Sequence, residues 1–245
     1  MRALLTAGAN EHLDFALLEA AGEGEMKAVQ TLLAVGANID AVDKDGLTPL
    51  LRAVARRPTT QRTMTIRALL TAGANVNATT RDGWTALMKV VEENYFTEMK
   101  GAMLAAGRPD KIMDITAAGV LVLRAQLHTW HALLGATPNV DATCDDGRTA
   151  LMIAAAEGHN GFVEELLDKG ANVNGTDNEG RTALMLAALK GHIDIVKALL
   201  RGSAFMDARA NVNMRARDGA TALSLAKKKE HGEIVALLEE AGAKQ

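Results

Sequence analysis

Residues 177–200, with the sequence DNEGRTALMLAALKGHIDIVKALL, contain the signals for two short helices joined by a glycine. The stretch opens with a turn signal at residues 178–180, and Thr182 stands where a helix N-cap is expected. Gly191 is expected to end the first helix, because glycine tolerates the left-handed conformation at the C′ position. A second helix is predicted over residues 192–200. Each helix is roughly 9 residues long, below the ~12–15 that an isolated helix needs in water, so the unit requires neighbours that bury its apolar faces.

Matching units occur elsewhere in the chain. The sequence DGRTALM at residues 146–152 matches EGRTALM at residues 179–185, and the turn glycines Gly147 and Gly180 lie 33 positions apart. A period of this length, with two helices and a turn in each unit, is typical of a stacked solenoid. Because each unit of a solenoid contacts only the next, the pattern favours one domain of stacked units.

The repeated residues resemble the ankyrin repeat, whose pattern starts D-x-x-G-x-T-P-L and finishes G-A-x-V-N. Parts of that pattern recur as DGLTPL at 45–50, DGWTAL at 82–87, DGATAL at 218–223, GANID at 36–40, and GANVN at 73–77 and 170–174. The resemblance covers almost the whole chain. It implies an all-α ankyrin-repeat solenoid of stacked helix–turn–helix units with short β-hairpin or turn connections. A fold of this kind does not by itself identify a partner.

We expect residues 1–245 to form a single ankyrin-repeat domain. The expected units cover residues 11–42, 43–79, 80–110, 111–143, 144–176, 177–215 and 216–245. The unit at 111–143 is degenerate, because it lacks the turn signature; its helices are predicted near residues 112–117 and 122–134. The last unit is polar on its outer face, with a run of three lysines at 227–229, which fits a C-terminal cap.

Three segments depart from the regular period. Residues 1–10, MRALLTAGAN, nearly duplicate IRALLTAGAN at 66–75, so they are expected to be part of an N-terminal repeat or a lone capping helix. Alternatively, residues 13–33 form the cap. Extra residues lie within 56–62, where a proline interrupts the first helix, and within 201–208, where the second helix either lengthens or gives way to a protruding loop.

Composition limits the possible partners. The net charge is −3 at pH 7, so no overall field attracts nucleic acid or an anionic membrane. No apolar run approaches the ~20 residues of a membrane span, and residues 1–10 are too short for a signal peptide. The single cysteine, Cys144, cannot form an internal disulfide, which favours a reducing compartment, and we expect a cytoplasmic monomer. The expected partner is an unidentified protein; nucleic acid and membrane are not expected.

The sequence offers little for catalysis, and we expect no enzyme activity, no cofactor and no metal. His128 and His131 stand at i and i+3, so two metal ligands on one helix face are possible, but catalytic zinc requires three protein ligands. Trp130, between them, is expected in the core. His159 and His192 hold the glycine–histidine position of the ankyrin repeat, where the resemblance implies a structural hydrogen bond.

The position after T-P-L, which is histidine in the ankyrin repeat, differs throughout this chain. It is occupied by Leu51, Met88, Met152, Met185 and Ser224. The side-chain hydrogen bonds of that corner are therefore expected to be absent. Packing is expected to replace them, since methionine adapts to irregular gaps.

An arginine cluster in the second unit supports an alternative function. It consists of Arg52, Arg56, Arg57, Arg62 and Arg67. Guanidinium groups can bind phosphate or an acidic peptide, so the alternative is a module that contacts phosphate or nucleic acid through a basic loop. The structural alternative is a solvated insertion loop.

The main functional prediction is a concave groove that holds a protein partner. The turn tips and first helices are expected to form it, through Lys44, Asp45, Leu47, Arg81, Asp82, Trp84, Glu92, Glu93, Asp145, Asp146, Arg148, Glu157, Asn178, Glu179, Arg181, Leu189 and Lys190. Charges of both signs along this row suit a protein ligand better than a polyanion. Trp84 follows Gly83 at an expected hairpin tip, where a large aromatic side chain is a candidate binding hot spot; alternatively, it folds onto the neighbouring tip.

Overall fold

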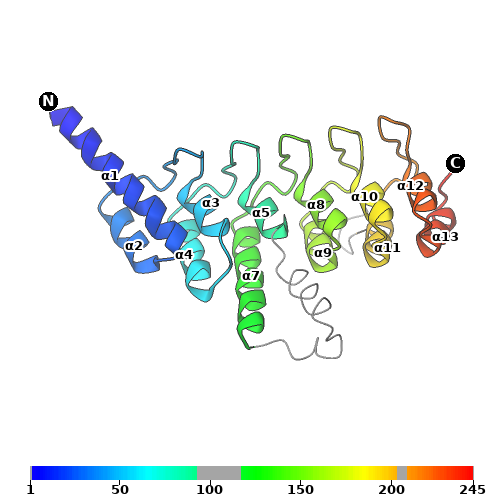
Figure 1. The fold of residues 1–245 in the computed structure, drawn as a ribbon, viewed down its shortest axis with the longest axis horizontal. Coiled ribbons are helices and arrows are strands. Elements are labelled where there is room, and N and C mark those ends of the chain that lie inside the picture. The colour runs from blue at the N-terminus through cyan, green and yellow to red at the C-terminus, as the bar shows by residue number, and fades with distance from the viewer. Residues whose placement is uncertain (1, 93–116, 203–208, 245) are drawn as a thin grey trace. The chain divides into compact units, whose positions relative to one another are not determined.

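The computed structural model describes residues 2–92, 117–202 and 209–244, and its regular elements there are α-helices (Figure 1). The chain divides into two compact units, unit 1 over residues 1–138 and unit 2 over residues 139–245. The expectation of one domain over the whole chain stays a prediction. None of the described helices combines the length and the apolar character that a membrane crossing requires.

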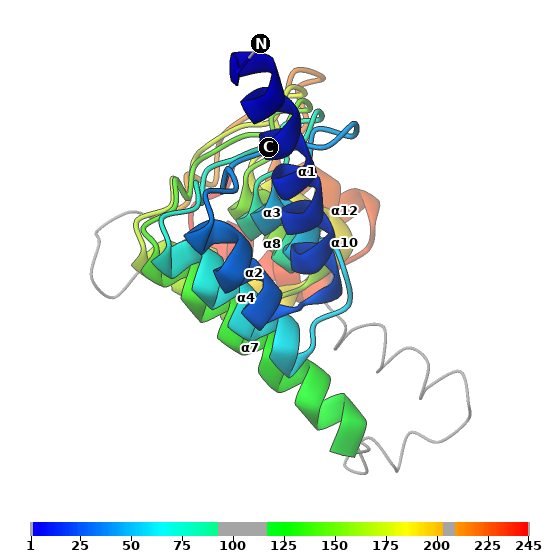
Figure 2. The same cartoon turned by 90° about the vertical axis from the view of Figure 1, so that its left-hand side faces the viewer.

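Unit 1 contains two rows of helices. Its elements are α1 (Arg2–Glu23), α2 (Met26–Ala34), α3 (Pro49–Val54), α4 (Thr60–Thr71), α5 (Ala86–Glu92) and α7 (Ala117–Gly135). The first row consists of α1, α3 and α5, and the second of α2, α4 and α7, with each helix packed against the next in its row (Figure 2). Helices of the two rows also pack in pairs, α1 on α2 and α3 on α4.

Unit 2 repeats this arrangement with shorter and more regular pairs. Its elements are α8 (Ala150–Glu157), α9 (Asn160–Asp168), α10 (Ala183–Lys190), α11 (Ile193–Arg201), α12 (Ala222–Lys228) and α13 (Gly232–Glu240). The first helices α8, α10 and α12 pack in sequence order, as do the second helices α9, α11 and α13. The predicted all-α solenoid of helix–turn–helix units is confirmed.

Threonine side chains cap the N-termini of the first helices, as the sequence predicted for Thr182. The Thr182 hydroxyl accepts the Met185 N–H at 3.3 Å, and the Thr149 hydroxyl accepts the Met152 N–H at the same distance. Each bond satisfies a backbone donor that the first helical turn leaves without a partner. At the other end of α10, Gly191 has φ 85°, so its predicted left-handed conformation is confirmed.

At most corners where the ankyrin repeat has a histidine, this chain has a buried apolar side chain. Met88, Met152 and Met185 are each only 1% exposed. Ser224 is the exception to the predicted absence of side-chain bonds, because its hydroxyl accepts the Thr221 N–H at 2.9 Å in a capping box. Trp130 is completely buried, so its predicted place in the core is confirmed.

Carboxylate and amide side chains in the turns that follow the second helices link successive helix pairs. An Asp40 carboxylate oxygen accepts the Asn75 N–H at 2.9 Å in unit 1. In unit 2, Asp141 accepts the Asn172 N–H at 2.8 Å and the Asn174 amide oxygen accepts the Asn211 N–H at 2.7 Å. These bonds fix the spacing between pairs, since each joins one repeat to the next.

The irregular segments differ from the expectations in informative ways. One continuous helix, α1, spans both the segment 1–10 and the first half of the predicted pair at 13–33, with no turn between them. In the second unit, α4 begins at Thr60 and is 12 residues long, so part of the extra sequence lengthens the second helix. In contrast, α11 ends at Arg201 after 9 residues and does not lengthen; residues 203–208 lie outside the described part of the chain.

The predicted degenerate unit at 111–143 is described only in its second half. Its expected first helix, and the expected second helix of the unit at 80–110, fall within residues 93–116, outside the described residues. The described helix α7 is 19 residues long and packs against both α4 and α5. Those are the two neighbours that the second helix of the third pair would have.

Candidate partner-binding site

The turns that precede the first helices, here called fingers, comprise residues 43–47, 80–84, 144–148, 177–181 and 216–220. In the finger at 177–181, one carboxylate oxygen of Asp177 accepts the N–H groups of Glu179 and Arg181 at 3.0 and 2.8 Å. Asp43 accepts two N–H groups in the same way in the first finger. An aspartate at this position therefore holds the turn closed, as short polar side chains do in Asx turns.

Neighbouring fingers are hydrogen-bonded to each other within each unit. In unit 2, the Asn178 side-chain amide donates to the Asp145 carbonyl at 2.8 Å, and the Arg217 N–H donates to the Glu179 carbonyl at 2.8 Å. In unit 1, the Arg81 guanidinium donates to the Lys44 carbonyl. The fingers are thus positioned by one another, and a partner that binds them would meet a largely pre-formed surface.

Several predicted site residues in unit 2 stabilise their own fingers. Arg181 pairs with the carboxylates of Asp177, at 2.8 Å, and Glu179. Arg148 pairs with Asp146 in the preceding finger. Burial raises the pKa of Asp146, but the hydrogen bonds from Cys144 and Arg148 outweigh it and hold that pKa below its usual value. The guanidinium groups therefore have structural partners before any ligand binds.

The remaining predicted residues of unit 2 lie on its exposed rim. Asp145, Asn178 and Glu179 are exposed in the fingers, while Glu157 and Lys190 are exposed at the last residues of α8 and α10. Leu189 is half-buried beside Lys190. Glu157 and Lys190 occupy equivalent positions in successive repeats, and the role of these residues in partner binding stays a prediction.

Trp84 is not a free hairpin tip. Its side chain is half-buried, and the Lys89 ammonium lies 4.5 Å from the centre of the ring. Lys89 also pairs with Glu92 at 3.0 Å, so Trp84 of the finger forms one cluster with Lys89 and Glu92 of α5. Glu93, the other predicted acidic residue here, lies outside the described residues.

A groove in unit 1 lies between α1 and the first finger, with a volume of about 660 Å³. It is lined by Glu11, Asp14, Phe15, Leu18, Glu19, Asn38, Ala41, Val42, Asp43, Lys44, Asp45 and Arg52. We call it the α1 groove. Of the predicted site residues it contains Lys44, Asp45 and Arg52. Sequence reasoning missed the rest, although Phe15 is one of only four phenylalanines in the chain and gave a usable signal.

The α1 groove contains exposed apolar side chains and carboxylates, and an arginine pairs with two of these carboxylates. Phe15 is 63% exposed and Val42 is 65% exposed, both unusually high for large apolar side chains. The Arg52 guanidinium lies between two carboxylates, 2.9 Å from Glu19 and 3.6 Å from Asp43. Arg52 thereby joins α3 to α1 and to the finger, and fixes the floor of the groove.

The five arginines of the cluster do not lie in one loop, and their predicted contact with phosphate stays a prediction. Arg62 and Arg67 lie on α4 and Arg52 on α3, so only Arg56 and Arg57 are in the connection between these helices. Arg56 pairs with Glu23 at 3.2 Å, and Arg62 donates to the Gly22 carbonyl at 3.2 Å. Arg52, Arg56 and Arg62 therefore already have partners on α1.

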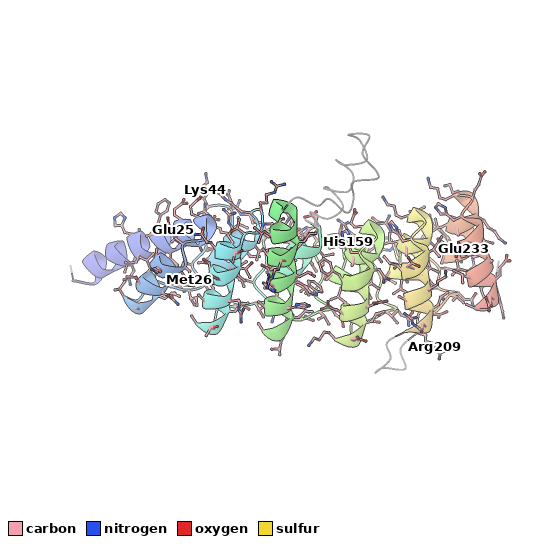
Figure 3. The ribbon with its side chains drawn as sticks, turned by 90° about the horizontal axis from the view of Figure 1, so that it is seen from below. Glu25, Met26, Lys44, His159, Arg209 and Glu233 are labelled. Atoms are coloured by element: carbon pink, nitrogen blue, oxygen red, sulfur yellow. The ribbon has the colours of Figure 1, made fainter. Side chains whose placement is uncertain are left out.

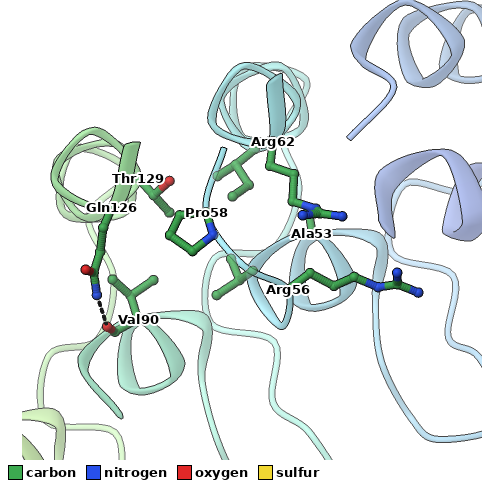
Figure 4. A pocket seen from close by; sticks show the side chains of 9 residues that line it. Ala53, Arg56, Pro58, Arg62, Val90, Gln126 and Thr129 are labelled. Carbon is green, nitrogen blue, oxygen red and sulfur yellow. Dashed lines mark hydrogen bonds between the residues drawn. The ribbon is translucent and has the colours of Figure 1, made fainter. Parts of the chain in front are cut away.

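Arg56 and Arg62 border a small cavity of about 20 Å³ between α3, α4, α5 and α7 (Figure 4). Its wall includes Pro58 and Gln126, whose side-chain amide donates to the Val90 carbonyl at 3.1 Å. Nearby, the Thr63 hydroxyl lies 3.0 Å from the Thr129 hydroxyl. The cavity has room for about one water molecule, so it is part of the interhelical packing and not a ligand pocket.

A second, more open groove lies between α2 and α4, with a volume of about 520 Å³. Its lining includes Met26, which Figure 3 labels on α2, together with Met64 and Arg67 on α4. Met64 is 51% exposed. This groove is formed by second helices, whereas the predicted partner surface was assigned to fingers and first helices.

The histidines have structural roles. His192 Nε2 lies 3.0 Å from the Ala156 carbonyl oxygen, so the predicted hydrogen bond is confirmed. His159 is buried, and burial together with the nearby His192 lowers its pKa to about 4. His128 and His131 are both exposed on α7, and no group of three metal-ligating side chains occurs among the described residues.

Comparison with known proteins identifies the class. The family model for ankyrin repeats in three copies matches residues 17–100 and 120–210, which is more than half of the chain. The chain therefore belongs to the ankyrin repeat family. No curated protein matches it at a significant level.

Solved structures agree with this family. An ankyrin repeat domain from Acinetobacter baumannii AYE is 27% identical with a TM-score of 0.72, and the alignment covers 93% of this chain and 98% of that domain. The human ASB11 ankyrin repeat domain is 23% identical with a TM-score of 0.64, over 93% of this chain and 84% of the domain. At that identity, the second likeness shows the fold alone.

Proposed function

We propose that this protein is a non-catalytic scaffold that holds a protein partner against the fingers and first helices of its repeats. Ankyrin repeats are generally protein–protein interaction modules, and this chain belongs to that family. The observation that supports a specific surface is the α1 groove, where Phe15 and Val42 remain more than half exposed. Exposed large apolar side chains in a groove bordered by charged residues often mark protein interfaces and anchor the partner there.

The proposal includes the cellular compartment and the oligomeric state of the protein. The single cysteine is buried as a free thiol, and burial raises its pKa, so Cys144 is poorly suited to oxidation or disulfide exchange. Because one cysteine allows no internal disulfide, we propose a reducing compartment such as the cytoplasm. We further propose that the scaffold acts as a monomer, which light scattering would test.

Site-specific crosslinking tests the function. A photoreactive phenylalanine analogue placed at Phe15 in the full chain should form covalent adducts with a protein partner in lysate, and excess unlabelled wild-type protein should suppress them. The same analogue at Val35, which is 60% exposed but outside the groove, is the matched control. Equal adducts at the two positions, or adducts that wild-type protein does not suppress, would contradict the proposal.

A further inference from the structure

The charges of the α1 groove indicate the chemistry of its partner. Its lining contains five carboxylates, from Glu11, Asp14, Glu19, Asp43 and Asp45, against the two cations Lys44 and Arg52, a net charge of −3. The whole chain also has a net charge of −3. The charges of the rest of the chain therefore sum to zero, whereas the groove itself has an excess of carboxylates.

The five carboxylates are not equally available. Glu19 and Asp43 share Arg52, and an Asp14 carboxylate oxygen accepts the Asn38 N–H at 2.6 Å. Among the described residues, neither the Glu11 nor the Asp45 carboxylate has an ion pair. Glu11 lies on α1 and Asp45 on the finger, so the two available anions border the groove on both of its sides.

Apolar side chains line the same groove as these anions. Glu11, Asp14, Phe15 and Leu18 follow one another at i, i+3, i+4 and i+7 on α1, so they share one face of the helix. Val42, directly before the first finger, lines the same groove. A ligand that covers Phe15 and Val42 would therefore place its flanking residues beside carboxylates.

We infer that the α1 groove binds a basic segment of a partner protein, one that presents a large apolar side chain flanked by lysine or arginine. This inference rests on the proposed function and specifies the partner for it. Charge complementarity selects this occupant, because an acidic segment or a nucleic acid would meet like charge at Glu11 and Asp45. The same anions would accelerate association of a cationic segment at low salt.

Selection from a displayed library of short random peptides on the full-length protein tests the inference. The selected peptides should have a net positive charge and at least one large apolar residue. Their affinity should fall by about tenfold or more in Phe15→Ser, and by a similar factor in the double variant Glu11→Lys with Asp45→Lys. Added salt should weaken wild-type binding and have little effect on what remains in the double variant.

Matched controls separate these effects from changes in folding. Val35→Ser removes an equally exposed apolar side chain outside the groove, and Glu240→Lys reverses an exposed charge on α13. Both should leave peptide affinity unchanged, and all variants should keep the melting temperature of the wild type, since the altered side chains are exposed.

Three results would overturn the inference, and they differ in whether the proposed function is also contradicted. Neutral or acidic peptides that require Phe15 but tolerate the charge reversals would disprove a basic partner while supporting the proposed function. A failure to select any peptide that depends on Phe15 would contradict both. A wild-type dimer in light scattering that Phe15→Ser abolishes would assign the groove to a second copy of the chain.

Discussion

His159 is a titratable residue whose burial should make stability depend on pH. Its side chain is 7% exposed, with its ring edge-to-face against Phe162 at 6.0 Å. Burial and the charge of His192 lower its pKa from 6.5 to about 4, so the folded state favours neutral imidazole. Between those values the unfolded chain binds more protons than the folded chain. The contribution of His159 is therefore complete above pH 6.5 and is lost as pH falls toward 4.

The expected result is a fall in the free energy of unfolding of about 3 kcal/mol at most from His159 between pH 6.5 and 4, at ~1.4 kcal/mol per pKa unit. Urea titrations across this range on wild type and His159→Gln would measure it, with the exposed His128→Gln as the control. A His159→Gln curve that keeps the full wild-type slope would show that another group is responsible.

Gly191 meets two requirements at once, and a comparison with Gly219 can separate them. Both glycines have positive φ, 85° and 81°, which strains any side chain. A Cβ at Gly191 would also lie 2.9 Å from the His231 ring, whereas one at Gly219 would meet no described atom within 4 Å. We expect Gly219→Ala to cost about 1 kcal/mol and Gly191→Ala clearly more, measured by chemical denaturation. Equal losses would mean that the ring moves away at no cost.

Trp84→Ala tests whether the finger surface binds a partner. Lys89 lies over the ring, so we expect a loss of about 0.5–1 kcal/mol, the range for an exposed cation–π contact. If Trp84 anchors a partner, the affinity should fall by about 2 kcal/mol or more. Parallel thermal melts and binding titrations would compare the two quantities. Losses of equal size would mark Trp84 as a packing residue only.

Among the helices, the packing of α7 indicates where the third repeat ends and the next begins. It packs against α4 as α4 packs against α2, and it contacts α5 as α4 contacts α3. We propose that α7 is the second helix of the unit that begins at Thr80, so that residues 80–143 form one long unit and not two. Buried hydroxyls support this packing, since Thr63 on α4 donates to the Ala125 carbonyl of α7 at 3.1 Å.

Replacing residues 97–112 by a short glycine–serine linker tests this division. If α7 completes the third pair, the variant should stay folded and lose little free energy of unfolding, because the α4–α7 and α5–α7 contacts are retained. Circular dichroism and denaturation of the full chain would show it. Loss of cooperative unfolding in unit 1 would mean that the replaced segment contains an essential repeat helix.

At the scale of the whole molecule, each compact unit has its own core. Unit 2 contains three complete helix pairs, and its buried residues include Leu151, Leu184 and Leu223 of the successive first helices. About three repeats are the minimum that a solenoid needs to be stable. Residues 139–245 expressed alone should therefore give a helical spectrum and a cooperative thermal transition. A spectrum typical of an unfolded chain would show that unit 2 depends on the rest of the protein.

The sequence by itself determined the helix pairs. The N-cap at Thr182, the left-handed glycine at Gly191 and the period of the turn signals depend on interactions within a few residues, so they can be predicted without the fold. The same locality explains why the buried methionines and Trp130 were assigned correctly. Each lies on the apolar face of a helix that the sequence pattern already indicated.

Only the tertiary structure decided where functional side chains meet. Phe15 and Val42 line one groove although they are far apart in the sequence, and Arg52 and Arg56 both pair with carboxylates of α1. The position of α7 likewise depends on which helices it packs against, across a stretch without the repeat signature. These features arise from contacts between residues far apart in the chain, and local sequence patterns do not specify such contacts.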